Sequence, residues 1–72
     1  MKFISSINRI MEQKKLTTTE LAKKADVSRQ TIFKARQDEG IAECRLSTLA
    51  RIGVALGVKT KRLYDEVEEE KA

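Results

Sequence analysis

The sequence predicts an all-α fold, from two features of its composition and one of its pattern. The 72 residues include no Pro, three Gly and only 4% aromatic residues. They are rich in Ala, Leu, Lys, Glu and Arg, which favour helices, and poor in the β-branched and aromatic runs that favour strands. Apolar residues recur at steps of three and four, the period of a helix with one buried face. We expect one small domain over residues 1–67 and an acidic tail over residues 68–72.

Five apolar residues near the N-terminus predict the first helix, because their spacing places them on one face. They are Phe3, Ile4, Ile7, Ile10 and Met11. Lys14 and Lys15 fall in its last turn, where a cation complements the negative end of the helix dipole. The pattern breaks at Leu16 and Thr17, so we expect the helix to end there.

The second predicted helix begins with a capping box. Thr17 is followed three residues later by Glu20, so the hydroxyl can accept a hydrogen bond from the Glu20 amide while the carboxylate reaches back. Asp26 then turns the chain, since Asp tolerates the left-handed conformation better than most residues. The buried side of this helix consists of Leu21, Ala22 and Ala25.

The third predicted helix starts after Ser28, a good N-cap, and runs to about Glu39, where Gly40 ends it. Ile32 and Ala35 point inward. The opposite side carries Arg29, Gln30, Phe33, Lys34 and Gln37.

Two further helices complete the prediction. A loop from Gly40 to Cys44 leads to a fourth helix, which Gly57 ends. A short fifth helix follows Val58 and carries Leu63, Tyr64 and Val67. The chain is therefore expected to form one compact unit of five helices. The buried stripe of the fourth consists of Leu46, Leu49, Ile52, Ala55 and Leu56.

Charge is unevenly distributed along the chain. The net charge is +4, but residues 1–36 hold nine Lys/Arg and three Asp/Glu, whereas residues 37–72 hold six and eight. A basic first half and an acidic end suggest one face made for a polyanion and another turned away from it. Charge alone favours the simpler explanation, a solvated surface of mixed charge.

The composition argues against several classes of function. With no His, one Cys and no convergent carboxylates, the chain lacks the usual metal-binding sets and His-based acid–base catalysis, and no catalytic constellation is recognised. We therefore expect no enzyme activity and no cofactor. Cys44 is expected to be a small, inert, partly buried residue in a reducing compartment. No segment has the character of a signal peptide or a membrane span, so a cytoplasmic location is expected.

The outward side of the third predicted helix carries chemistry suited to the edges of base pairs. Arg matches guanine with two hydrogen bonds, Gln matches adenine, and an apolar group can meet a thymine methyl. Arg29, Gln30, Phe33 and Lys34 supply such groups at neighbouring positions. The start of the second helix, residues 17–19, offers backbone amides and hydroxyls to a phosphate.

These motifs resemble a known family. The run LTTTELAKKADVSRQTIFKA (16–35) is similar to the helix-turn-helix of the Cro/CI-type, or XRE, repressors. RLSTLARIGVALGV (45–58) is similar to the fourth helix of that family, and KRLY (61–64) to the opening of its fifth. The resemblance runs from the first helix to about Glu66. It implies a five-helix, lambda-repressor-like DNA-binding domain with the helix-turn-helix in helices 2 and 3.

The resemblance also implies which residues touch DNA. Family members usually contact bases with the first two residues of the recognition helix and with another residue one turn on. These are Arg29, Gln30 and Lys34 here, with Phe33 at an occasional contact position. Thr18 stands where the family often has Gln, so its reach to a phosphate is shorter. Phosphate contacts are expected at the starts of helices 2, 3 and 4, from Thr18, Thr19, Ser28, Thr31 and Arg45.

The sequence departs from the family pattern in ways that bear on DNA binding. Asp26 replaces the Gly of the turn, and the Pro before the fourth helix is missing. The third helix and its loop are longer than in the simplest members and carry Asp38, Glu39 and Glu43. Acids this close to phosphates weaken binding or restrict its geometry.

Two functions of different classes follow. The first is a Cro-like repressor, bacterial or phage-encoded, that binds a near-palindromic double-stranded DNA operator as a weak homodimer. Leu56 and Val58 lie where Cro-like proteins often make the dimer contact. The second is a protein-binding module of the same fold, such as an antitoxin or a partner that occludes a phage repressor. Phe33 bears on the choice, since it could pack against the domain, meet a thymine or anchor a protein partner.

Overall fold

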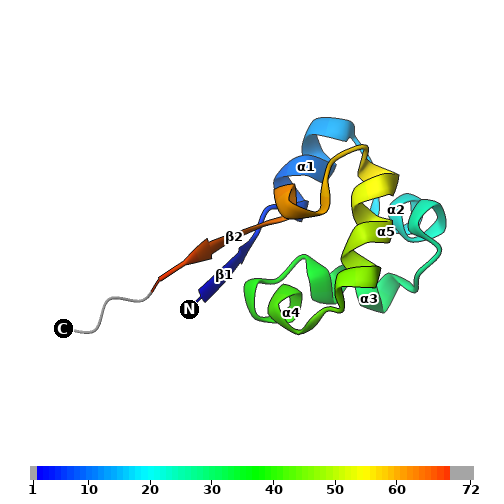
Figure 1. Ribbon diagram of the computed structural model, residues 1–72. Helices are drawn as coiled ribbons and strands as arrows, with labels where there is room; N and C mark the ends of the chain where they lie inside the picture. The colour runs from blue at the N-terminus through cyan, green and yellow to red at the C-terminus, as the bar shows by residue number, and fades with distance from the viewer. Residues whose placement is uncertain (1, 69–72) are drawn as a thin grey trace.

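The computed structural model describes residues 2–68 and is mostly helical, which confirms the predicted fold class. A two-stranded sheet is a minor addition to the helices. Figure 1 shows α2 beside α5 on the side away from the two strands, with α3 at the lower end of α5. Of the predicted acidic tail, residues 69–72 lie outside the described residues. The elements in chain order are β1 (Lys2–Ser5), α1 (Ile7–Lys14), α2 (Thr18–Ala25), α3 (Arg29–Ala35), α4 (Asp38–Glu43), α5 (Leu46–Leu56), the 3₁₀ helix η1 (Thr60–Arg62) and β2 (Tyr64–Val67).

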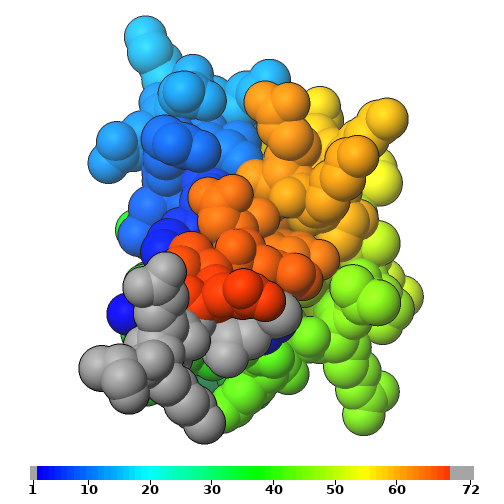
Figure 2. Space-filling model, turned by 60° about the vertical axis from the view of Figure 1, so that its left-hand side comes forward, coloured from blue at the N-terminus to red at the C-terminus, as the bar shows by residue number. Residues whose placement is uncertain are grey.

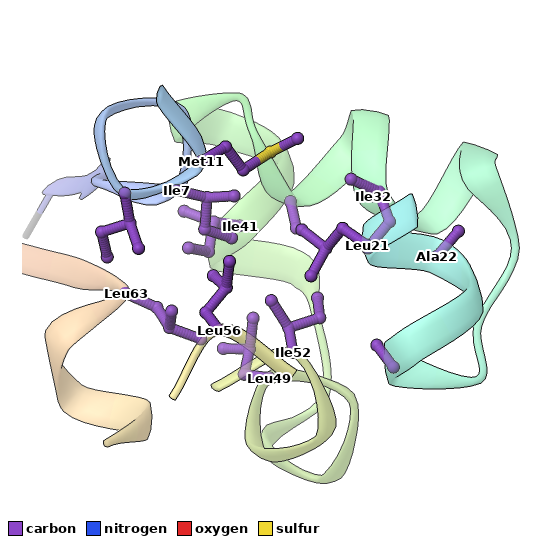
Figure 3. Packing of buried hydrophobic residues seen from close by; sticks show 13 residues of the cluster. Ile7, Met11, Leu21, Ala22, Ile32, Ile41, Leu49, Ile52, Leu56 and Leu63 are labelled. Carbon is purple, nitrogen blue, oxygen red and sulfur yellow. The ribbon is translucent and has the colours of Figure 1, made fainter. Parts of the chain in front are cut away.

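The core forms around α5, which contacts α1, α2 and η1. Figure 3 shows apolar side chains from all five α-helices of the described chain, and from Leu63, meeting at its centre. The residues predicted to face inward on the second and third helices are all buried, so these two faces are confirmed. They are Leu21, Ala22, Ala25, Ile32 and Ala35. The opposite sides of α2 and α3 are therefore turned toward solvent.

The N-terminal segment is a strand, so the predicted start of the first helix is wrong. Ile7, Ile10 and Met11 are buried as expected, but Phe3 and Ile4 lie in β1. β1 pairs antiparallel with β2, and Ile4 is an exposed residue of that pair. A short run of apolar residues at these spacings fits a helix, or a strand that leads into one, and periodicity cannot choose between them.

Tertiary hydrogen bonds explain the choice of a strand. The Ser5 hydroxyl donates to the Ala35 carbonyl oxygen (2.7 Å), and the Ser5 amide donates to Asp38 Oδ1 (2.8 Å). The Ser6 amide donates to the Leu63 carbonyl oxygen (2.8 Å). These partners are far away in sequence, and they hold the chain in the extended form that aromatic and β-branched residues also prefer.

The predicted third helix is divided in two, so its predicted length and the loop after it are wrong. α3 ends at Ala35, and Gln37 is extended (φ −100°, ψ 145°) before α4 begins at Asp38. Gly40, expected to end the third helix, lies inside α4. A Cβ at this position would lie only 2.0 Å from the Lys34 carbonyl oxygen. Gly40 therefore serves close packing of α4 on α3 rather than helix termination.

The predicted fifth helix is also wrong. Residues 60–62 form a single 3₁₀ turn, and residues 64–67 form β2. Leu63 still fills the core, and the Tyr64 ring packs edge-on against Phe3 with ring centroids 5.8 Å apart. Figure 2 shows η1 and β2 as the orange and red segment that crosses one face of the molecule beside the blue N-terminal residues. Tyr and Val favour strands, and β1 supplies a pairing partner that local periodicity does not reveal.

α5 matches the predicted fourth helix, and Gly57 ends it in the left-handed conformation (φ 74°) as expected. The predicted buried stripe has one wrong member, because Leu46 is 70% exposed. It is the first residue of the helix and lines a surface cavity of about 190 Å³ together with Phe3 and Tyr64. The confirmed members of the stripe are Leu49, Ile52, Leu56 and the half-buried Ala55.

α2 and α3 begin as predicted. Thr17 Oγ1 accepts from the Glu20 amide (3.1 Å) and Glu20 Oε1 accepts from the Thr17 amide (3.1 Å), which completes the capping box. Ser28 Oγ accepts from the Thr31 amide (3.1 Å) at the start of α3. Asp26 takes the predicted left-handed conformation (φ 57°) between the two helices.

The capping box has a consequence for acid stability. Hydrogen bonds from the Thr17 backbone and side chain lower the pKa of Glu20, and Lys24 lowers it further. The ionised carboxylate therefore stabilises the fold above its unfolded pKa, and this contribution is lost as the pH falls through the folded pKa. Urea unfolding measures this contribution. When the pH is lowered from neutral to about 3, we expect the free energy of unfolding to fall less for Glu20→Gln than for the unsubstituted protein.

The control for this prediction is Glu12→Gln, which removes a carboxylate from the exposed side of α1, outside the capping box. It measures the effect of changing the net charge by one unit. If the stability of Glu20→Gln fell with pH in parallel with that of the unsubstituted protein, the proposed role of the capping box would be wrong.

Candidate nucleic-acid interface

α2, the turn at residues 26–28 and α3 form a helix-turn-helix. Two backbone hydrogen bonds close the end of α2: the Asp26 amide donates to the Lys23 carbonyl oxygen (3.3 Å) and the Val27 amide to that of Ala22 (3.1 Å). The half-buried Val27 then packs against the core. Because the buried side of α3 is anchored in the core, its other side is presented to solvent.

The solvent side of α3 carries the four predicted base contacts. Arg29, Gln30, Phe33 and Lys34 are all exposed, as the sequence predicted. They bring a guanidinium, an amide, an aromatic ring and an ammonium group to one side of a seven-residue helix. This arrangement can donate to the acceptors of a guanine edge and both donate to and accept from an adenine edge.

Lys34 is paired with an acid of the next helix. Its Nζ lies 3.5 Å from Glu43 Oε2, and the two side chains are 50% and 72% exposed. An ion pair this exposed contributes between zero and about 1 kcal/mol, and salt screens it. Glu43, one of the acids expected close to DNA, thus contacts a predicted base-contact residue directly.

Phe33 lies at the rim of the same surface. The residue is 52% exposed, and the Arg36 guanidinium lies over its ring, 5.9 Å from the ring centroid. A cation at this distance is attracted to the ring by its quadrupole. Phe33 therefore packs in part against the domain and also keeps an exposed apolar surface.

The start of α2 is linked to the end of α3. Arg36, which follows α3, donates from Nη1 to Thr18 Oγ1 (2.8 Å) and from Nε to the Asn8 side-chain oxygen of α1. Thr18 is half-buried, and its hydroxyl retains a hydrogen that it can donate to another group. Thr18, a predicted phosphate contact, is thus held in place by Arg36, for which no role was predicted.

A shallow depression between α2 and α3 brings predicted phosphate contacts next to a predicted base contact. Thr19, Ser28 and Arg29 line it, and Lys23 adds a cation. Asp26 also lines this depression, so an acidic residue lies among the groups that would meet a phosphate. The depression therefore combines hydrogen-bond donors with one acid that opposes an anion.

The hydroxyl groups of Ser28 and Thr31 are hydrogen-bonded to each other. Their hydroxyl oxygens lie 2.9 Å apart, so one hydroxyl donates to the other. One O–H of the pair remains for an outside acceptor. Ser28 is exposed and Thr31 is half-buried.

The remaining predicted contacts lie outside α2 and α3. Arg45 is exposed and immediately precedes α5. Leu56 is only 2% exposed and belongs to the core, so it has almost no surface to offer a second copy. Val58 is half-buried and keeps part of its surface.

Cys44 has the surroundings of a structural residue. It is half-buried, and its thiol donates to the Gly40 carbonyl oxygen (3.4 Å). Burial raises the pKa of the Cys44 thiol, so little thiolate is present at neutral pH. Within residues 2–68, no three His, Cys, Asp or Glu side chains come together as ligands for a metal ion. The described helices include none with the length and apolar character needed to span a membrane.

Arg36 is the residue of this surface that had no predicted role, whereas Glu43 was expected near the interface but not in contact with Lys34. Arg36 follows Ile32 by four positions, so helical periodicity places a cation at the edge of the buried side. This position indicates that the Arg36 side chain can reach a neighbouring helix, but it does not indicate which helix. Glu43 was expected in a loop, and only the formation of α4 explains its contact with Lys34.

The geometry defines a helix-turn-helix domain with an exposed polar recognition helix. A family model of the Cro/C1-type HTH DNA-binding domain matches residues 6–65, and the chain belongs to that family. The resemblance inferred from the motifs is thereby confirmed. No curated protein matches the chain. Membership makes the chain a DNA-binding domain of the kind found in transcriptional regulators.

Proposed function

We propose that the protein is a sequence-specific repressor that binds operator DNA through α3. The observation that carries this proposal is the exposed strip formed by Arg29, Gln30 and Lys34 on one side of that helix. Each of these side chains has hydrogen-bonding groups that match base edges in the major groove. None of the three is needed to fill the core, so they are available for recognition.

The proposed mode of binding follows from the chemistry of each side chain. α3 enters the major groove, where Arg29 donates two hydrogen bonds to a guanine and Gln30 pairs with an adenine. Lys34 leaves Glu43 for a base or phosphate acceptor, which costs little because the ion pair is exposed. The exposed apolar surface of Phe33 meets a thymine methyl.

Backbone contacts would fix the position of α3 on the duplex. Thr19 and Ser28 lie together beside Arg29, and Thr18 and Arg45 add donors from the starts of two other helices. Such contacts carry no sequence information but supply most of the affinity. Asp26 in the same depression keeps this affinity moderate. We therefore propose that binding requires a homodimer, with Val58 near its contact, on half-sites about one helical turn (roughly 34 Å) apart.

The proposal is tested by selecting DNA from a random pool and measuring binding at several salt concentrations. We expect a near-palindromic sequence to be enriched, and a complex of two chains per site by analytical ultracentrifugation. The affinity for this DNA is expected to fall by at least about 10-fold between 50 and 200 mM salt, because bound cations release counterions from the phosphates. Enrichment of no sequence, together with affinity that does not change with salt, would exclude the repressor.

One observation favours a second function, binding of another protein on the same surface. Phe33 is 52% exposed, and α4 places the acids Asp38, Glu39 and Glu43 after it in exposed positions. An exposed apolar ring together with these exposed acids would suit the basic DNA-binding face of a repressor or a basic toxin surface. Arg29→Ala and Phe33→Ala separate the two functions, because the first removes a proposed base contact and the second an apolar anchor.

A further inference from the structure

Arg36 has the geometry of a DNA-backbone contact as well as that of a link between helices. We propose that its guanidinium binds a DNA phosphate next to Thr18, an inference that rests on the proposed DNA-binding function. The side chain is half-buried and comes from the residue that follows α3. It reaches across to the start of α2, where a phosphate contact is expected.

The guanidinium is positioned by three groups from three helices. Nε donates to the Asn8 side-chain oxygen of α1, Nη1 donates to Thr18 Oγ1 (2.8 Å), and the Phe33 ring of α3 lies 5.9 Å away. These contacts already restrict the rotamers of the long Arg36 side chain. Less side-chain entropy is therefore lost when it binds an anion. Arg36 is therefore already ordered before any ligand arrives.

All three of these groups are neutral. Within residues 2–68 the ion pair that forms is between Lys34 and Glu43, and no carboxylate pairs with Arg36. A guanidinium has five N–H donors, and the two hydrogen bonds to Asn8 and Thr18 use two of them. The positive charge and three donors are left for an anion, and the paired donors of Arg match the oxygens of a phosphate.

The position of Thr18 indicates which anion this would be. Thr18 is the first residue of α2, at the helix end whose backbone amides favour an anion, and its own side chain is short. Because Thr18 accepts from Arg36, its hydroxyl hydrogen is free to donate to the same phosphate. Arg36 thus supplies the reach and the charge, and Thr18 adds a second donor beside it.

The experiment measures how the affinity for the selected DNA depends on salt for the unsubstituted protein and for three variants. We expect Arg36→Gln to lower the affinity about 10-fold at low salt and to reduce the slope of log K against log salt by about 0.9 per bound domain. Arg36→Lys keeps the charge and is expected to keep the slope. Arg62→Gln, in η1, removes an exposed Arg elsewhere and is expected to keep both affinity and slope.

A purely structural role gives a different result. If Arg36 only links the helices, Arg36→Gln lowers the affinity by the same factor at every salt concentration, and that parallel shift would overturn the proposal. The repressor itself fails separately, since it requires a salt-dependent affinity of the unsubstituted protein. A second measurement needs no variant: the Nε–H signal of Arg36 in NMR spectra is expected to shift when the selected DNA is added, while that of Arg62 stays in place. An unmoved Arg36 signal would contradict the proposal even if Arg36→Gln did not fold.

Discussion

Replacing Arg29 with Ala is expected to weaken binding to the selected DNA by about 5- to 160-fold for each half-site, because each half-site loses one bidentate contact to guanine worth about 1–3 kcal/mol. Arg29 is the first residue of α3 and is fully outside the core, so its removal should leave the fold intact. Binding is measured by fluorescence anisotropy at one fixed salt concentration. A repeated DNA selection with the variant is expected to lose its preference at one base pair per half-site.

The matched control is Arg62→Ala, which removes the same charge from η1, an element that contacts α5 and β2. It is expected to bind the selected DNA with unchanged preference. If Arg29→Ala and Arg62→Ala weakened binding equally and changed no base preference, Arg29 would be a general cation rather than a base contact. That outcome would remove the main support for sequence-specific repression.

Phe33→Ala distinguishes DNA recognition from protein binding on the same surface. Under the repressor function, this variant loses only an apolar contact and binds DNA a few-fold more weakly. Under the protein-binding function, it removes the buried anchor of the interface, which typically costs 2 kcal/mol or more, about 30-fold in affinity. Arg29→Ala should then affect the partner less than Phe33→Ala does.

The parts of the fold that the sequence predicted correctly depend on local chemistry. The capping box of Thr17 and Glu20, the Ser28 cap and the left-handed Asp26 each involve residues within one or two turns. The buried sides of α1, α2, α3 and α5 follow from the helical spacing of their apolar residues. These features locate the helix-turn-helix, and therefore the candidate interface, before any coordinates are known.

The wrong parts depend on partners that are distant in the sequence. Phe3 and Ile4 form a strand only because residues 64–67 lie beside them, some sixty positions away. α4 separates from α3 because Asp38 and Gly40 pack against β1 and against the Lys34 carbonyl group. Neither contact is visible in a local pattern, and both change which residues surround the interface.

The same division applies to the candidate site. The exposure of Arg29, Gln30 and Lys34 could be predicted because it follows from the period of a single helix. The Lys34–Glu43 ion pair and the Arg36–Thr18 hydrogen bond could not, because each joins two helices whose packing the sequence does not state. Long side chains at the edge of a buried face are where such contacts should be sought.

Replacing Gly40 with Ala is expected to destabilise the protein by about 3 kcal/mol, the upper part of the usual range for overpacking. The added Cβ would lie 2.0 Å from the Lys34 carbonyl oxygen and 2.8 Å from its carbonyl carbon. These are backbone atoms, so no side-chain rotation can relieve the contact, and α4 must move away from α3. Helix propensity alone predicts the opposite sign, because Ala inside a helix is about 1 kcal/mol more favourable than Gly.

Urea unfolding followed by circular dichroism measures this difference, with Gly57→Ala as the control. A Cβ at Gly57 meets nothing within 4 Å, so only its left-handed φ of 74° opposes Ala. We expect that substitution to cost about 1–2 kcal/mol, less than Gly40→Ala. If Gly40→Ala were instead as stable as the unsubstituted protein or more so, α4 would not pack on α3 in the described way. The position of Glu43 beside Lys34 in the candidate interface would then lose its structural basis, since α4 is what brings the two side chains together.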